Sequence, residues 1–234
     1  MSNWCSIFCA TEDRDSVMAA VRAWLAANGC VLYDPFSVIP GASYPVAVKL
    51  FVSPTAQGAG SAWVRLILAE PVAGLAEALQ GVAPAVLFDL AGGSAAGGAT
   101  LAGVDLAALS GDAQAMASRV DMKQAGAMAN RLIGSLGKRL GASDADAAAA
   151  RALLAAAQID WSGAAGSRLI AEAFRLGLPA SWQTPDFTTL RDAYAVHKRL
   201  ERSPNARLYP GDAEARDAVP DALTYTPIFG GKRA

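Results

Sequence analysis

The stretch Val46–Val52, which reads VAVKLFV, decides the fold class of this protein. Every second residue from Val46 to Val52 is a branched apolar residue, and a period of two is typical of a β-strand. Residues 54–60 are small or polar and include glycine, which predicts a hairpin loop. The apolar run at residues 63–68 then predicts the returning strand. The two strands therefore indicate an antiparallel sheet.

Outward from this hairpin, strands and helices alternate along the N-terminal part of the chain. Short apolar runs predict further strands at residues 4–9, 30–33 and 86–90. Apolar residues at helical spacing predict a helix at residues 13–29, and Pro71 begins a second helix that ends near Gly81. We therefore predict an α+β fold in which residues 1–92 form an antiparallel-rich sheet with two helices.

The remaining chain divides into three further parts. Residues 93–112 are rich in glycine and alanine, which predicts a flexible connection. Residues 113–204 carry a helical period that glycine and proline interrupt, so we predict an all-helical C-terminal region. Residues 205–234 hold several prolines and little periodicity, which predicts an extended C-terminal arm.

Apolar residues near the end of this arm are candidate anchors for a partner. They are Tyr225, Ile228 and Phe229. A purely disordered tail would lack such residues. We therefore expect the arm to dock on the body of the protein or on a neighbouring subunit, and we predict that these three residues bind a partner.

The charges are unevenly distributed, although the formal net charge is only −1. Residues 1–118 carry 4 basic and 9 acidic side chains, and residues 119–210 carry 13 basic and 8 acidic ones. Residues 211–234 carry 3 basic and 4 acidic side chains. This asymmetry suggests docking of the two halves on each other, an acidic partner or nucleic acid. A set of solvated helices would give the same pattern.

Neither a membrane span nor a signal peptide is predicted. No stretch approaches the ~18–20 uninterrupted apolar residues that a membrane helix needs. The N-terminus lacks the order of charged and apolar residues found in signal peptides. Cys5, Cys9 and Cys30 are an odd number of widely spaced thiols and make a poor disulfide framework. We therefore expect a cytoplasmic protein without a membrane partner.

Residues that bind metals or act as nucleophiles are scarce. The sequence has no CxxC pair and its only histidine, His197, is far from the cysteines, so we predict core cysteines, no metal site and no cofactor. No nucleophile motif accompanies His197, and its charged neighbours indicate an exposed helix face. The glycine-rich residues 92–98 lack the lysine and the spacing of a phosphate-binding loop.

Carboxylates offer one alternative function, because pairs of them catalyse acid–base reactions. Asp34, Glu70 and Asp89 lie near the ends of predicted strands, where active sites often occur. The sequence does not bring any two of them together, and a turn position or a solvated strand end explains each more simply. An enzyme with a carboxylate-based site is therefore one alternative.

A basic helix offers a second alternative. The predicted helix at residues 186–202 carries four cations that would suit phosphate contacts: Arg191, Lys198, Arg199 and Arg202. Asp192 and Glu201 lie on the same helix, and the whole chain is slightly acidic. Both facts weaken the hypothesis of a nucleic-acid-binding protein, since dedicated binders are often strongly basic.

The sequence best fits a non-catalytic protein. We expect a cytoplasmic interaction, adaptor or assembly protein whose partner is another protein or a further copy of itself. Nucleic-acid binding through residues 186–202 and a carboxylate-based enzyme are the alternatives.

Overall fold

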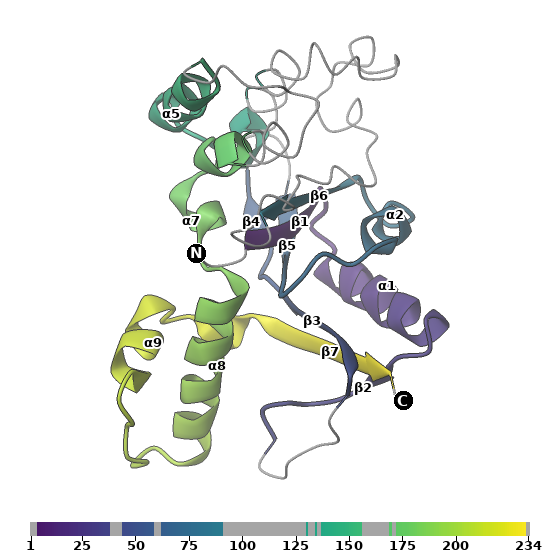
Figure 1. Cartoon of the computed structure of the whole chain (residues 1–234), viewed down its shortest axis with the longest axis vertical. Coiled ribbons are helices and arrows are strands. Elements are labelled where there is room, and N and C mark those ends of the chain that lie inside the picture. Colours follow the sequence, from purple (N-terminus) through teal and green to yellow (C-terminus); the bar gives the residue numbers. More distant parts are fainter. Residues whose placement is uncertain are drawn as a thin grey trace.

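A seven-stranded antiparallel sheet organises the fold in the computed structural model of the chain (Figure 1). The structure describes residues 4–37, 44–58, 62–90, 137–155 and 172–232, together with residues 130, 134 and 169. Helices pack against this sheet, so the predicted α+β fold class is confirmed. The predicted connection at residues 93–112 lies outside the described residues.

The order of the strands in the sheet differs from their order in the chain. The strands are β1 (Trp4–Cys9), β2 (Val31–Leu32), β3 (Val46–Val52), β4 (Ala56–Gln57), β5 (Ala62–Leu68), β6 (Ala85–Leu90) and β7 (Thr226–Lys232). They are arranged as β2-β7-β3-β5-β1-β6, and β4 pairs with β5. The predicted pairing of β3 with β5 is confirmed, with Phe51 opposite Ile67.

Two helices, α1 (Arg14–Ala27) and α2 (Leu75–Leu79), cover one face of the sheet. α1 begins after Asp13, whose Oδ1 accepts a hydrogen bond from the N–H of Ser16 at 2.9 Å. It ends before Gly29, whose φ of +72° lies in the left-handed region that favours glycine. The core on this face includes Cys5, Cys9, Val17, Val21, Leu25, Leu66, Leu68 and Leu75.

Helices from the second half of the chain cover the opposite face. α5 (Asp144–Ala155) and α7 (Ala180–Gln183) share a core with β1 and β6, in which Phe88 stacks on Phe174. Ser143 caps α5, because its hydroxyl accepts a hydrogen bond from the N–H of Asp146 at 3.2 Å.

α8 (Phe187–Arg202) covers the other half of this second face, above β3 and β7 (Figure 1). Two shorter elements, α9 (Asp212–Ala218) and the 3-10 helix η2 (Ala222–Thr224), pack against α8. No helix in the described part of the chain is both long enough and apolar enough to cross a membrane.

The segment predicted as an extended arm ends as an interior strand of the sheet. β7 pairs with β3 from Val52 opposite Thr226 to Val46 opposite Lys232, and with β2 on its other side. Ile228 and Phe229 are only 3% and 5% exposed. The arm therefore docks on the body of its own chain, and the sheet of residues 1–92 is incomplete without it.

Two glycines allow β7 to fit between α1 on one face of the sheet and Tyr44 on the other. A Cβ atom on Gly230 would lie 2.8 Å from Cδ2 of Leu25, and one on Gly231 would lie 2.2 Å from Cγ of Tyr44. Real Cβ atoms do not approach other atoms so closely. The Gly-Gly pair therefore lets α1 and Tyr44 contact the backbone of β7 from opposite faces.

Candidate functional site

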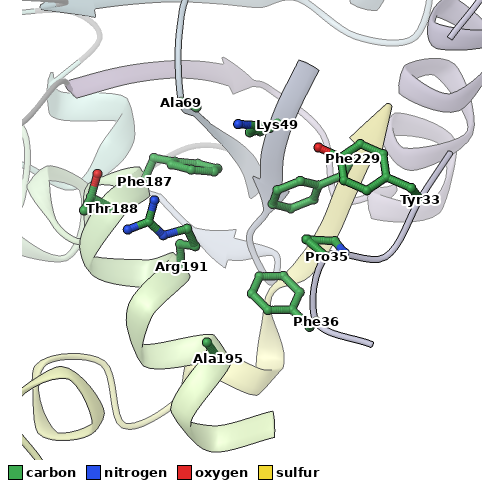
Figure 2. Close-up of a pocket in the computed structure, with 10 residues that line it drawn as sticks. All are labelled: Tyr33, Pro35, Phe36, Lys49, Ala69, Phe187, Thr188, Arg191, Ala195 and Phe229. Atoms are coloured by element: carbon green, nitrogen blue, oxygen red, sulfur yellow. The ribbon is translucent and has the colours of Figure 1, made fainter. Parts of the chain in front are cut away.

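A pocket lies where α8 crosses the sheet, and we call it the α8 pocket. Its volume is about 640 Å³. Figure 2 shows its lining residues, which come from the segment after β2, from β3, from the end of β5, from α8 and from β7: Tyr33, Pro35, Phe36, Lys49, Ala69, Phe187, Thr188, Arg191, Ala195 and Phe229. Five separate segments of the chain therefore build one concave surface.

Aromatic rings form much of the α8 pocket. The ring centroid of Phe229 lies 5.7 Å from that of Phe36 and 6.1 Å from that of Phe187. Tyr33 contacts Phe229 edge to face, with centroids 5.8 Å apart. Phe187 and Phe229 are buried, whereas Tyr33 and Phe36 are half-buried. Rings held at these separations by their neighbours form a rigid apolar surface.

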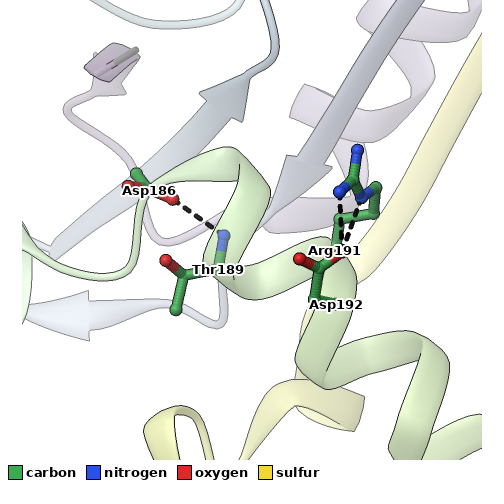
Figure 3. A network of polar contacts seen from close by, with 4 residues as sticks. All are labelled: Asp186, Thr189, Arg191 and Asp192. Atoms are coloured by element: carbon green, nitrogen blue, oxygen red, sulfur yellow. Dashed lines mark hydrogen bonds and ion pairs between the residues drawn. The ribbon is translucent and has the colours of Figure 1, made fainter. Parts of the chain in front are cut away.

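Two cations are part of the lining of the α8 pocket, Lys49 on the strand side and Arg191 on the helix side (Figure 2). Lys49 comes from β3 and is exposed. Arg191 comes from α8, and its Nε and Nη2 donate hydrogen bonds to Oδ1 of Asp192 at 2.8 and 2.7 Å (Figure 3). Nη1 of Arg191 takes part in neither bond, so the guanidinium can still donate to a ligand.

The first turn of α8 is held in place by its cap. Oδ1 of Asp186 accepts a hydrogen bond from the N–H of Thr189 at 2.8 Å (Figure 3). This bond satisfies one of the free N–H groups at the start of the helix. The cap thereby orients Phe187, Thr188 and Arg191 toward the pocket.

Arg65 connects the start of α8 to the sheet. Its side chain is 2% exposed, and its Nη1 and Nη2 donate hydrogen bonds to the carbonyls of Thr184 and Pro185, each at 3.1 Å. Its Nε donates to the hydroxyl of Ser6 at 3.0 Å. Burial lowers the pKa of Arg65 to about 10, so the guanidinium stays charged near pH 7. One buried cation therefore fixes the chain just before α8.

The four cations of the predicted nucleic-acid-binding helix each have a partner within the chain. Arg191 pairs with Asp192, and Lys198 pairs with Glu201 at 2.6 Å. Arg199 pairs with Asp212 of α9, and Arg202 donates to the carbonyl of Phe36. Of the four, only Arg191 lines the α8 pocket. A phosphate would have to compete with these internal partners.

His197 lies at the contact between α8 and α9 rather than on an exposed face. Its Nε2 is 3.2 Å from the carbonyl oxygen of Val219 and 3.4 Å from that of Arg216. Two carbonyl neighbours require Nε2 to carry a hydrogen, which it donates. The prediction of a surface histidine is therefore corrected: His197 is half-buried and joins α8 to the chain that follows α9.

The structure places none of the three candidate carboxylates in the lining of the α8 pocket. Oδ1 of Asp34 accepts a hydrogen bond from the N–H of Phe36 at 2.8 Å, as a turn residue does. Asp89 is buried on β6, at the opposite edge of the sheet from β2, and Glu70 is exposed.

The cysteines lie in or beside the core. Cys5 and Cys9 are buried against α1 and α2, and Cys30 is half-buried. Burial raises the pKa of Cys9 to about 12, and burial followed by the charge of Asp89 raises the pKa of Cys5. Among the residues that the structure describes, no three His, Cys, Asp or Glu side chains are grouped as metal ligands would be.

This burial predicts a clear order of thiol reactivity. Only the thiolate reacts quickly, and a pKa near 12 leaves about one Cys9 thiol in 10,000 ionised at pH 8. We expect a maleimide to label one thiol, Cys30, in the native protein and all three in urea, as counted by mass spectrometry. Cys30→Ala removes the native label. Rapid native labelling of Cys5 or Cys9 would contradict the burial of β1.

Comparisons with protein-family models, with curated proteins and with solved structures found no match to this chain. The α8 pocket therefore has to be interpreted from its own chemistry. Sequence reasoning gave no role to Phe36, Lys49 or Phe187, because no motif marks them. One feature of the sequence could have pointed to the pocket: Lys49 is the only charged residue in the apolar strand Val46–Val52.

Proposed function

We propose that this protein is a cytoplasmic, non-catalytic interaction protein that binds a segment of a protein partner in the α8 pocket. The observation that carries this proposal is a pocket of about 640 Å³ with four aromatic side chains in its lining. Pockets of ~300–1,000 Å³ with mostly apolar walls and a few polar groups are typical binding sites. Aromatic residues and arginine are also enriched where proteins bind proteins.

The lining of the α8 pocket suits binding better than catalysis. It contains no carboxylate and no histidine, so it offers neither of the usual acid–base groups. An enzyme using Asp34, Glu70 or Asp89 is the less favoured proposal, because none of these residues lines the α8 pocket. Nucleic-acid binding through residues 186–202 is also less favoured, because its cations are already paired.

Site-specific crosslinking tests the proposal. A photoreactive phenylalanine at position 195, an exposed residue of α8 in the pocket lining, should capture a partner in cells of the source organism. The matched control places the same amino acid at Ala23, an exposed position of α1 on the other face of the sheet. We expect a crosslinked protein band from position 195 that position 23 does not give.

The identity of the captured molecule decides between the proposals. A protein crosslinked at peptides of defined sequence supports partner binding in the α8 pocket. Crosslinks that are the same from both positions, or that contain nucleic acid instead of protein, would overturn it.

A further inference from the structure

The charge of the α8 pocket limits what it can bind. In the described part of the chain, no carboxylate lies within 4 Å of Nζ of Lys49. Arg191 shares its charge with Asp192, and both of these side chains are about half exposed, at 47% and 49%. Among the lining residues and Asp192, two cations and one carboxylate leave one net positive charge. An anion with a single charge would balance it.

The depth of the α8 pocket sets a second requirement. Its rim consists of exposed residues, among them Lys49, Thr188, Arg191 and Ala195. Its inner wall contains the buried rings of Phe187 and Phe229. A ligand that fills the pocket therefore needs an apolar group directed inward. It also needs a negative charge at the opening, within reach of Lys49 and Arg191.

We propose that the α8 pocket recognises an acidic peptide segment, in which an aromatic or large aliphatic side chain packs against the pocket-facing edges of Phe187 and Phe229 while a neighbouring Asp or Glu contacts Lys49 and Arg191. This inference rests on the proposed function and specifies the partner. An exposed rim along a helix and a strand lets an extended chain cross the opening. The buried rings would supply most of the affinity. The two cations would supply the preference for an acidic residue in the peptide.

A carboxylate fits the rim better than a phosphate does. A phosphate monoester carries about −1.5 to −2 charges at pH 7, which exceeds the single net charge available. Asp192, which already accepts two hydrogen bonds from Arg191, would also repel a phosphate more strongly than a singly charged carboxylate. The carboxylate of Asp or Glu carries one charge and can accept a bond from Nη1 of Arg191 and another from Lys49.

Selection from a phage library of random twelve-residue peptides on the full-length protein tests the inference. We expect enriched sequences to place an aromatic or large aliphatic residue within three positions of Asp or Glu. The most enriched peptide is then synthesised in three forms, with its acidic residue retained, replaced by the amide, or replaced by phosphoserine. Fluorescence anisotropy should rank the acidic form tightest, because only that form matches the single charge at the rim.

Variants of the protein locate the contact. Lys49→Gln and Arg191→Gln should each weaken binding by about twofold to fivefold, the effect of an exposed ion pair. Ala195→Trp should block the opening and abolish binding. Lys198→Gln is the matched control, since it removes one charge from α8 outside the pocket lining and should leave binding unchanged.

Several results would contradict the acidic-peptide inference, and some of them would also contradict the proposed function. Enriched peptides without acidic residues, a phosphoserine form that binds more tightly, or equal binding by Lys49→Gln would overturn the acidic-peptide inference. Specific crosslinks from position 195 without any enriched peptide would also overturn it, while leaving the proposed function in place. Absence of both crosslinks and peptides would overturn the two together.

Discussion

A chain that stops after Tyr225 is expected to lose its native fold, because it lacks the whole of β7. β3 would lose its partner along the seven residues Val46–Val52, and β2 would lose its contact with the sheet. Two buried side chains, Ile228 and Phe229, would also be removed. Together these losses cost about 10 kcal/mol, which is comparable with the whole stability of a typical domain.

Circular dichroism and thermal unfolding measure this effect. The truncated chain should lack the cooperative transition of the full chain, and a synthetic peptide of residues 221–234 should restore it in part. Removal of residues 233 and 234 alone is the control and should leave the transition unchanged. A cooperative transition at the original temperature in the truncated chain would show that β7 is dispensable.

The burial of β7 also limits how partner binding by the C-terminal anchors can be tested. Because Ile228 and Phe229 are buried within their own chain, an assembly lost after truncation would reflect unfolding as well as loss of contact. Tyr225 is half-buried and precedes β7, so Tyr225→Ala separates the two effects better. The prediction that these three residues bind a partner stays a prediction.

Arg65→Met is expected to destabilise the protein by about 3 kcal/mol, the second largest effect that the structure predicts. Methionine keeps much of the side-chain volume but donates no hydrogen bond. The carbonyl of Pro185 and the hydroxyl of Ser6 would each lose a donor in a buried place, and the carbonyl of Thr184 would lose one in a partly buried place. For a chain of this length, the loss corresponds to a fall in melting temperature of roughly 6–12 °C.

Arg22→Met is the control for this substitution, because Arg22 is exposed on α1 and should change stability by less than about 0.5 kcal/mol. Buried charges replaced by apolar residues are sometimes neutral or stabilising. If the Arg65→Met protein is as stable as the wild type, then Arg65 is one of these buried charges whose replacement costs no stability. This result would mean that packing around Trp4 and Phe8, and not hydrogen bonding, holds the segment before α8.

Local patterns predicted most of the elements in the described chain. The alternation in Val46–Val52 and the helical spacing in residues 13–29 each depend on neighbours in sequence, and both elements are present. The end of the helix at Gly29 was also predicted, because capping is local. These features need no knowledge of the rest of the molecule.

The position of β7 and the α8 pocket depend on contacts between distant segments, which local patterns do not encode. Residues 226–232 include Pro227 and two glycines, which are uncommon in an interior strand. They fit here because Leu25 and Tyr44 occupy the space that side chains would fill. Lys49 and Arg191 likewise meet only because α8 packs on the sheet.

The late position of β7 in the chain has a consequence for biosynthesis. A ribosome that has made β3 must add more than 170 further residues before β7 exists, which takes on the order of ten seconds or more. Throughout that interval the edge of β3 is an open template, and exposed edges invite pairing with other chains. The nascent protein is therefore exposed to such pairing until β7 has been made, and a chaperone that shields β-strands would act in that interval.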